Sequence, residues 1–257
     1  MKNELKALIF DVDGTLADTE RDGHRVAFNR TFAAASLDWV WDEALYGELL
    51  RVTGGKERMR FYLDQYRPDF VRPADLDAFL KTLHLAKNRE YATMLSTGVI
   101  ALRPGVRRLL AQARAEGLRL AVSTTTSPEN VEALLVNALA PDAMSWFEVV
   151  AAGDVVPAKK PAPDIYLYAL AELGLPASAC VAFEDSSNGF RSARDSDLLT
   201  IVTTNGYTEQ ETFEGAALVV DQFGEANSPM KVKAGNALGR HMVDLDLVRQ
   251  IHALRQN

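Results

Sequence analysis

The sequence predicts an α/β protein built on a parallel sheet, with an all-helical domain inserted near the start of the chain. Short, almost continuous apolar runs alternate with amphipathic helical patterns over most of the 257 residues. This alternation is typical of a parallel sheet covered by helices on both faces. Residues 18–97 interrupt this alternation, because they contain helical patterns but no convincing strand.

The expected strands are short and evenly distributed. The first covers residues 5–10, and further candidates cover residues 118–124, 148–154, 179–184, 198–204 and 218–221. Helices are expected between them at residues 106–115, from Pro128 after an N-cap at Ser127, and at residues 164–173 and 187–194. Ligands of such sheets bind at the carboxyl ends of the strands, so the residues after each strand are the first candidates for chemistry.

The boundaries of the two domains follow from the same patterns. Residues 1–17 and 98–257 are expected to form the α/β core, and residues 18–97 the helical domain, with helices at 24–35, 42–51, 55–66 and 74–95. Trp39 and Trp41 are expected to lie in the core of the helical domain. Residues 224–257 form a C-terminal extension, in which we expect a loop over 225–237 and an amphipathic helix over 242–254.

Composition limits the classes of function. The 28 Lys and Arg residues against 35 Asp and Glu give a net charge of −7, which argues against nucleic acid as a partner. Cys180 is the only cysteine and lies in an apolar run, so we expect a buried thiol and a reducing compartment. No signal-peptide pattern is visible, and no apolar run approaches the roughly 18 residues of a membrane span. We expect a soluble cytoplasmic protein (in the plastid stroma if the source is a photosynthetic eukaryote), with no membrane partner, as a monomer or weak dimer.

The segment Asp11-Val12-Asp13-Gly14-Thr15 directly follows the first expected strand. Two carboxylates two residues apart in a loop can converge on one point. There one can attack a phosphorus atom while the other donates a proton to the leaving oxygen. An Asx turn followed by a helix cap would use the same residue types.

Three further strand ends carry polar side chains. Ser123-Thr124-Thr125-Thr126 leads into a helix, where hydroxyls and free N–H groups suit phosphate oxygens, although an ordinary N-cap region uses the same residues. Lys159 and Lys160 precede a proline-stiffened helix start, where one lysine could neutralise a nucleophilic carboxylate and a phosphoryl group. A lone lysine pair is more often solvated surface. The adjacent acids Glu184 and Asp185 suit Mg²⁺.

Together these four stretches resemble the signature motifs of the haloacid dehalogenase superfamily, over roughly residues 5–223. The resemblance implies a Rossmann-like core with an inserted α-helical cap. It implies that Asp11 is the nucleophile, that Asp13 is the general acid/base, and that Thr124 and Lys160 bind the transferring phosphoryl group. Lys160 is chosen over Lys159 because it directly precedes the Pro-Ala-Pro-Asp run. The implied cofactor is Mg²⁺, with the ligands Asp11, Asp13, Glu184 and Asp185.

Shorter stretches resemble the CbbY-type members of the superfamily, at residues 18–24, 53–58, 84–87, 124–127 and 183–189. Members of that type dephosphorylate xylulose-1,5-bisphosphate, a by-product that inhibits Rubisco in the Calvin cycle. The segment Glu20–His24 is one residue longer here than in some bacterial members and resembles the plant-like pattern. The substrate-binding residues implied by this resemblance are Glu20, His24, Thr53, Gly54, Gly55, Lys56, His84, Lys87, Thr125 and Thr126.

Two of these stretches also have a plainer explanation. Gly54-Gly55-Lys56 has the composition of a flexible turn between helices with an incidental lysine. With the resemblance, its N–H groups and Lys56 are expected to hold a second, distal phosphate. His24 lies on a helix that faces a core, where histidines are more often structural. Beside Glu20 and Asp13, it is expected to contact the substrate.

The expected activity is hydrolysis of a small sugar bisphosphate, with xylulose-1,5-bisphosphate as the expected substrate. Hydrolysis would proceed by two in-line displacements through an aspartyl phosphate. The closed cap is expected to exclude bulk water during the first displacement. The nearest alternative is a β-phosphoglucomutase-like sugar phosphomutase, which shares the motifs and the cap type. A halide-releasing dehalogenase needs neither Asp13 nor metal-binding acids, and a catalytically silent module would not need Asp11, Asp13, Lys160 and Asp185 together.

Overall fold

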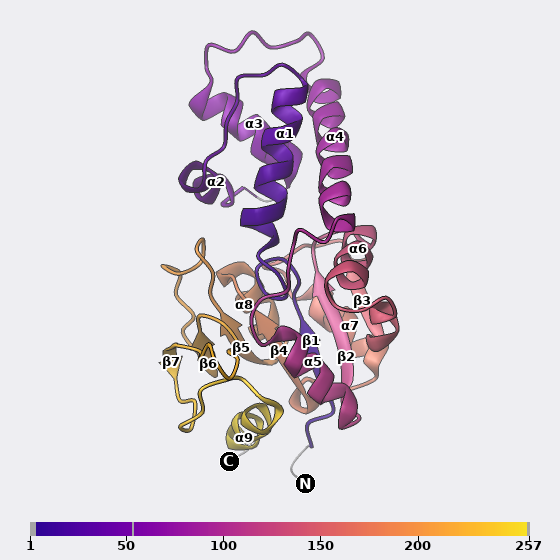
Figure 1. Cartoon of the computed structure of the whole chain (residues 1–257), viewed down its shortest axis with the longest axis vertical. Coiled ribbons are helices and arrows are strands. Elements are labelled where there is room, and N and C mark those ends of the chain that lie inside the picture. The colour runs from indigo at the N-terminus through magenta and orange to yellow at the C-terminus, as the bar shows by residue number, and fades with distance from the viewer. Residues whose placement is uncertain (1–3, 53, 256–257) are drawn as a thin grey trace. The chain divides into compact units, whose positions relative to one another are not determined.

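A computed structural model of the chain describes residues 4–52 and 54–255. The chain divides into two compact units, one formed by Met1–Asp18 and Ala101–Asn257 and the other by Thr19–Ile100. The first unit contains the strands, and the described part of the second consists of helices and loops (Figure 1). Among the described residues, no helix combines the length and the apolar character of a membrane span.

One sheet forms the centre of the first unit. In the described part of the chain its seven strands lie in the order β3-β2-β1-β4-β5-β6-β7. The first six are parallel, and β7 runs antiparallel to β6. The strands are β1 (Ala7–Phe10), β2 (Arg119–Thr124), β3 (Val149–Ala152), β4 (Cys180–Glu184), β5 (Leu199–Thr203), β6 (Leu218–Val220) and β7 (Val232–Gly235). The predicted α/β fold with a parallel-sheet core is confirmed.

The register of the central strands brings their ends to one edge. Phe10 of β1 lies beside Val122 of β2 and Phe183 of β4. The chain leaves β1 toward β2 and β3 on one side and returns to β4 and β5 on the other. The topological switch point, where ligands of such sheets bind, therefore lies between β1 and β4.

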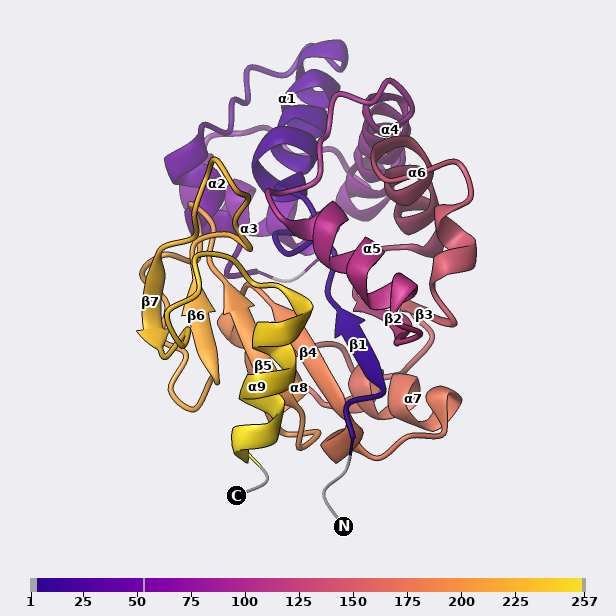
Figure 2. The same cartoon turned by 60° about the horizontal axis from the view of Figure 1, so that its bottom comes forward.

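Helices cover both faces of this sheet, as its buried strands require. The helices α5 (Val106–Ala115) and α9 (Leu245–Arg255) lie on one face, and α7 (Asp164–Leu173) and α8 (Ser187–Arg194) on the other (Figure 2). The helix α6 (Pro128–Ala138) packs on β3, and two short 3₁₀ turns lie at Ala143–Trp146 and Ala177–Ala179. Cys180 is buried in the core, and this burial raises the pKa of its thiol to about 12. The thiol is therefore a small hydrophobic group, as expected.

The C-terminal extension differs from the prediction in one element. Residues 225–237 were predicted to be a loop, but they contain β7. All four residues of β7 are exposed, and the alternation of Val232, Lys233 and Ala234 is too short to distinguish an edge strand from a loop. The predicted terminal helix is confirmed as α9, and the Asp244 carboxylate accepts a hydrogen bond from the Leu247 N–H at its start (2.8 Å).

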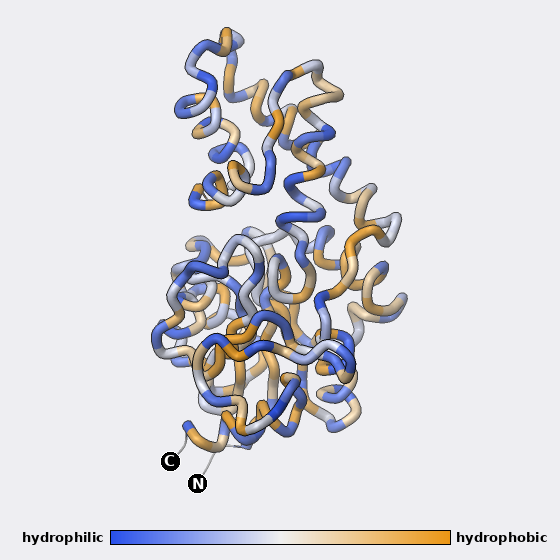
Figure 3. The backbone as a smooth tube through the Cα atoms, turned by 60° about the vertical axis from the view of Figure 1, so that its left-hand side comes forward, coloured by the Kyte–Doolittle hydropathy of each residue, from blue (hydrophilic) through white to orange (hydrophobic). Residues whose placement is uncertain are grey.

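The second unit is built from amphipathic helices. They are a π-turn (Glu20–His24), α1 (Arg25–Ala34), α2 (Glu43–Leu49), α3 (Gly55–Tyr66) and α4 (Leu76–Ser96). Apolar and polar positions alternate along them (Figure 3). Trp39 and Trp41 are buried, and Phe32 packs edge-on against both, so their predicted place in a core is confirmed. A π-turn holds more residues than an α-turn, and this one covers Glu20–His24, the segment that the resemblance predicts to be one residue longer than in some bacterial members.

Candidate active site

Asp11 lies where β1 ends. Its backbone N–H still donates to the Phe183 carbonyl of β4 (3.0 Å), so the sheet fixes its position. Its carboxylate is buried, and the Lys160 Nζ lies 2.7 Å from Oδ1. Burial raises the pKa of Asp11 to about 7 despite the opposing charge of Lys160, and the charges of Glu184 and Asp13 add to the rise. A carboxyl group poised near neutrality at a strand end is a functional-site candidate.

Lys160 joins three parts of the site. Its ammonium group donates to Asp11 Oδ1 (2.7 Å), to the Ser123 carbonyl (2.8 Å) and to Glu184 Oε1 (2.6 Å). An ammonium group has three donors, so these contacts use all of them. Burial lowers the pKa of Lys160, but the two acids outweigh it and raise the pKa above its ordinary value, so the side chain stays charged. Lys159 is exposed and pairs with a surface acid instead.

Glu184 is the last residue of β4 and its side chain is wholly buried. Its Oε1 accepts hydrogen bonds from Lys160 and from the hydroxyl of Tyr166 on α7 (2.5 Å). Its Oε2 has no hydrogen-bond partner among the described residues. A Cβ at Gly189, in the first turn of α8, would come within 1.8 Å of this oxygen, so the carboxylate occupies space that only glycine leaves open. Oε2 is therefore a buried acceptor whose hydrogen-bonding capacity is unused among the described residues.

Asp185 directly follows β4 and approaches the loop that carries Asp13. The amide of Asn205, which lies shortly after β5, donates to Asp185 Oδ2 (2.7 Å). A Cβ at Gly14 would lie 2.1 Å from the same oxygen, and the φ of Gly14 is 92°. Both the close approach and the backbone conformation require glycine. Burial raises the pKa of Asp185 well above its ordinary value, and the charges of Asp11 and Glu184 add to this rise.

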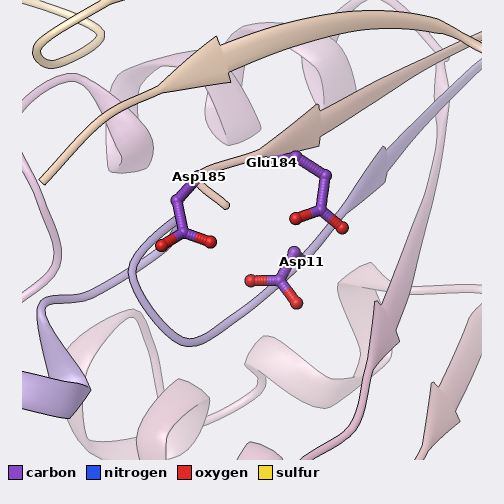
Figure 4. Close-up of side chains that lie close together, drawn as sticks. All are labelled: Asp11, Glu184 and Asp185. Carbon is purple, nitrogen blue, oxygen red and sulfur yellow. The ribbon is translucent and has the colours of Figure 1, made fainter. Parts of the chain in front are cut away.

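The carboxylates of Asp11, Glu184 and Asp185 form one buried acidic cluster. One oxygen from each lies within 4.8 Å of the others, beyond the ends of β1 and β4 (Figure 4). Carboxylate oxygens are the ligands that hard divalent cations prefer, and a cation would relieve the repulsion between the three groups. The donor set and the partnerless Glu184 Oε2 fit a divalent metal ion. Asp13 is half-buried in the adjacent loop and raises the pKa of Asp11, but it is not one of the three. Its roles as metal ligand and acid/base stay predictions.

The hydroxyl-rich stretch after β2 leads into α6 as predicted. Thr124 ends β2 and is buried, and its Oγ1 accepts from the N–H of Thr126 (3.2 Å). Thr125 is exposed and Thr126 half-buried. Ser127 occupies the N-cap position, with Pro128 as the first helical residue. Free N–H groups at this helix start could hold phosphate oxygens, and the individual roles of the threonines stay predictions.

Arg103 anchors the loop that carries Asp13. Its buried guanidinium group donates to the carbonyl groups of Gly14, Thr204 (2.6 Å) and Asp221 (2.7 Å), and it forms an ion pair with Asp18 (3.3 Å). One side chain thus ties the loop after β1 to the ends of β5 and β6. Its positive charge also opposes the rise in the pKa of Asp185.

Comparison with known proteins agrees with this geometry. Residues 5–197 match the haloacid dehalogenase-like hydrolases. The chain belongs to this family. The plasmid-encoded CbbY protein of Cupriavidus necator is 44% identical over 248 residues, which cover 96% of this chain and 97% of the relative. CbbY from Rhodobacter sphaeroides in complex with phosphate is 48% identical, with a TM-score of 0.78, and the match covers 86% of this chain and 96% of that chain.

A second crystal structure of the Rhodobacter sphaeroides protein holds xylulose-(1,5)bisphosphate in a mutant. It has a TM-score of 0.77 and the same identity, 48%, over 86% of this chain and 96% of that chain. The predicted membership of the CbbY type is confirmed, and so is the Rossmann-like core. The chain is a phosphatase, that is, a phosphoric monoester hydrolase.

In the helical unit of the hydrolase, His24 and Lys87 are buried side by side. The Lys87 Nζ lies 2.7 Å from His24 Nδ1 and 5.0–5.1 Å from the ring centroids of Tyr91 and Phe28. The His24 ring packs against Tyr91, with centroids 3.9 Å apart. An ammonium group only donates, so His24 Nδ1 is the acceptor in this contact.

Glu20 is held at the other end of the π-turn. Its Oε2 accepts from the hydroxyl of Tyr46 (2.6 Å), which in turn accepts from Arg58 Nη1 (2.8 Å). The Arg58 Nη1 lies 3.9 Å from the Glu20 carboxylate. These contacts give Glu20 a structural role within the unit, and its predicted contact with substrate stays a prediction.

The start of α3 is tightly packed and not merely a flexible turn. A Cβ at Gly54 would lie 2.2 Å from Glu57 Oε2, and one at Gly55 would lie 2.6 Å from the His84 ring. The glycines therefore let these side chains approach the backbone. Burial lowers the pKa of His84 to about 4, and the positive charges of Lys87 and Lys56 lower it further. Thr53, predicted to bind substrate, lies outside the described residues.

Three residues that shape the active site were missed by sequence reasoning. Asn205 directly follows the strand predicted at residues 198–204, so its place at a strand end is the signal that marks it. Arg103 lies shortly before the helix predicted at residues 106–115, and no motif marks it. Tyr166 lies on the apolar face of α7, and no pattern distinguishes its hydroxyl from an ordinary core position.

Proposed function

We propose that this phosphatase is Mg²⁺-dependent and hydrolyses a small sugar bisphosphate, xylulose-1,5-bisphosphate, through an aspartyl-phosphate intermediate. The observation that carries the proposal is a pair of charge clusters of opposite sign. The first unit gathers the acids Asp11, Glu184 and Asp185 around Lys160. The second gathers the basic side chains His24, Lys56, His84 and Lys87. The identity to a protein whose structure holds this bisphosphate supports the choice of substrate.

The residues of the first unit have the chemistry for two successive displacements. Asp11 attacks phosphorus, and Lys160 balances the negative charge that builds on the phosphoryl oxygens. Asp13 donates a proton to the departing sugar oxygen and then takes a proton from the water that hydrolyses the aspartyl phosphate. Thr124 and the N–H groups at the start of α6 bind phosphoryl oxygens.

The metal site is proposed to consist of Asp11, Asp13, Glu184 and Asp185. Bound there, Mg²⁺ would supply positive charge that offsets the repulsion of the acids and the charge of the phosphoryl group. The three carboxylates that lie together and the partnerless Glu184 Oε2 support this assignment. Asp185 is held in place for it by Asn205.

The second unit is proposed to bind the phosphate that is not cleaved. Lys56 and Lys87 would supply positive charge, and the His84 ring and the N–H groups of Gly54 and Gly55 would supply hydrogen-bond donors. A bound phosphate would relieve the repulsion that lowers the pKa of His84. The other proposed substrate-binding residues are Glu20, His24, Thr53, Thr125 and Thr126.

A phosphate-release assay tests this function directly. Xylulose-1,5-bisphosphate, ribulose-1,5-bisphosphate and their monophosphates are supplied side by side with Mg²⁺, and β-glucose 1-phosphate is included as a mutase substrate. We expect steady release of one phosphate per molecule, fastest from xylulose-1,5-bisphosphate. A preference for monophosphates would reject the bisphosphate assignment. Conversion of the glucose ester to its 6-phosphate without phosphate release would identify a mutase.

A further inference from the structure

The hydroxyl of Tyr166 and the ammonium group of Lys160 donate to the same oxygen. Glu184 Oε1 lies 2.5 Å from the first and 2.6 Å from the second. The Lys160 Nζ also lies 5.1 Å from the centroid of the Tyr166 ring, within the range of a cation–π contact. One buried side chain thus contacts both the acid and the lysine of the active site, although it follows no strand end.

These contacts determine how the Glu184 carboxylate is turned. The backbone of β4 fixes its Cα, but the terminal torsion of a glutamate rotates easily. Two donors on Oε1 remove this freedom, because turning the carboxylate would break both hydrogen bonds. They also leave Oε2 without a partner among the described residues, against Gly189.

The orientation of Lys160 depends on the same carboxylate. Two of its three donors are fixed by groups at the ends of neighbouring strands, the Ser123 carbonyl on β2 and Glu184 Oε1 on β4. The third donor is thereby directed at Asp11 Oδ1. A Glu184 carboxylate that turned freely would release one of the two anchors, and Lys160 would no longer be held on the nucleophile.

We propose that Tyr166 is a positioning residue for phosphoryl transfer, which acts through Glu184. Its hydroxyl keeps Oε1 on Lys160 and leaves Oε2 for the metal ion. The proposal rests on the roles of Lys160 and Glu184 in the proposed function. The simpler explanation is that Tyr166 fills space in the core cluster that includes Ile9 and Ala182. In that case phenylalanine would serve equally well.

Tyr166→Phe separates these explanations, because it removes the hydroxyl and keeps the ring. The matched control is Tyr168→Phe, on the same helix and packed against the same core cluster. Two experiments on the full chain give kcat, KM and the affinity for Mn²⁺. One is the hydrolysis of p-nitrophenyl phosphate at saturating Mg²⁺, and the other is direct binding of Mn²⁺, followed by electron paramagnetic resonance without substrate.

We expect Tyr166→Phe to lower kcat about 10- to 100-fold and to weaken Mn²⁺ binding about 10-fold, as loss of a group that orients a metal ligand does. KM should change less than about threefold, because the contact orients reacting groups and does not bind substrate. Tyr168→Phe should match the wild type in all three. Wild-type kcat and Mn²⁺ affinity in Tyr166→Phe would overturn the proposal, even if thermal stability fell. Weaker Mn²⁺ binding with an unchanged kcat at saturating metal would overturn it too, because Lys160 would then be positioned without Tyr166.

Glu184→Gln and Lys160→Ala distinguish failure of this proposal from failure of the proposed function. If both lose activity while Tyr166→Phe keeps it, only the role of Tyr166 is wrong. If Glu184→Gln and Lys160→Ala also keep wild-type kcat, the roles assigned to the active site are wrong and the inference falls with them.

Discussion

The two units of the hydrolase carry charge clusters of opposite sign, and the same physics acts on both. In the α/β unit, burial and neighbouring acids raise the pKa of Asp11 to about 7. In the helical unit, burial and neighbouring lysines lower the pKa of His84 to about 4. Each shift comes first from burial, and groups of like charge nearby increase it. A cation would stabilise the first cluster and an anion the second.

The two clusters differ in what holds them. The acids are placed by the register of parallel strands, since Phe10, the residue before Asp11, pairs with Phe183, the residue before Glu184. The basic residues are placed by the packing of helices. His84 and Lys87 lie three residues apart on α4, and His24 ends a π-turn. Strand register is rigid and helix faces are easily varied. We infer that the first unit provides the chemistry and the second the specificity.

Asp11→Asn should have the largest effect, because the comparison assigns all bond breaking to the acidic cluster. An amide is a poor nucleophile and a weaker metal ligand, so we expect turnover of p-nitrophenyl phosphate below about 1% of wild type. Steady-state hydrolysis at saturating Mg²⁺ measures it. Asp11 would not be the attacking group if the variant kept more than a few per cent of the rate.

Removal of the metal should also abolish activity. It should also change how the stability of the protein depends on pH, because the acidic cluster then has no cation. Without metal, the raised pKa of Asp11 means that the folded state holds a proton that the unfolded chain has lost, from about pH 4 to about pH 7. The free energy of unfolding therefore falls as the pH rises through that window, because the folded protein must give up the proton on Asp11. Metal binding needs ionised carboxylates and releases these protons.

Melting temperatures with and without Mg²⁺ test the sign of this linkage. We expect Mg²⁺ to stabilise the protein more at about pH 7.5 than at about pH 5.5, with activity lost in EDTA and restored by Mg²⁺. Full activity in excess EDTA after dialysis would show that the reaction needs no metal ion. Greater stabilisation at the lower pH would contradict the assignment of the acidic cluster.

Asp13→Asn should have a smaller effect of a different kind. Substrate still binds, but protonation of the leaving group and activation of water are lost, so we expect kcat to fall about 10²- to 10⁴-fold with little change in KM. Initial rates over a range of substrate concentrations separate the two parameters. A rise in KM alone would show that Asp13 binds substrate and is not the acid/base.

His84→Gln should have the smallest effect, with the opposite dependence on pH. The pKa of His84 is lowered from 6.5 to about 4, so its contribution to stability is complete above about pH 6.5 and is lost as the pH falls toward 4. Because the ring is partly exposed, screening should limit this loss to about 1 kcal/mol. Urea unfolding at about pH 7 and about pH 4.5 should show that the wild type loses more stability than the variant. Equal losses would mean that the pKa of His84 is not lowered in the folded protein.

Most of the active site could be predicted from the sequence because it follows strand ends. Asp11, Lys160, Glu184 and Asp185 lie far apart in the chain, and parallel register brings them together. Where a residue acts from a helix face, as Tyr166 does, the sequence shows only a core aromatic. The strand β7 was missed because it is only four residues long and its apolar residues are exposed at the sheet edge, not buried in the core.

The helical unit was harder to predict, because its residues meet through the packing of helices and do not follow strand ends. The composition of Gly54-Gly55-Lys56 fits a flexible turn, and only the structure shows that Glu57 and His84 pack against the two glycines. The contact between His24 and Lys87 joins residues on separate helices, so no local spacing indicates it.

The central claim is that chemistry and specificity belong to separate charge clusters, and Lys56→Ala tests it most directly. Lys56 is exposed at the start of α3, so its truncation should leave the fold intact. The measurement is kcat/KM for xylulose-1,5-bisphosphate and for p-nitrophenyl phosphate, with Lys159→Ala, an exposed lysine of the other unit, as the control. Loss of one charge-assisted contact to phosphate should lower kcat/KM for the bisphosphate about 10- to 100-fold. The value for p-nitrophenyl phosphate and both values for the control should stay unchanged. An equal loss on both substrates would contradict the account, because Lys56 would then support the reaction and not the recognition of the second phosphate.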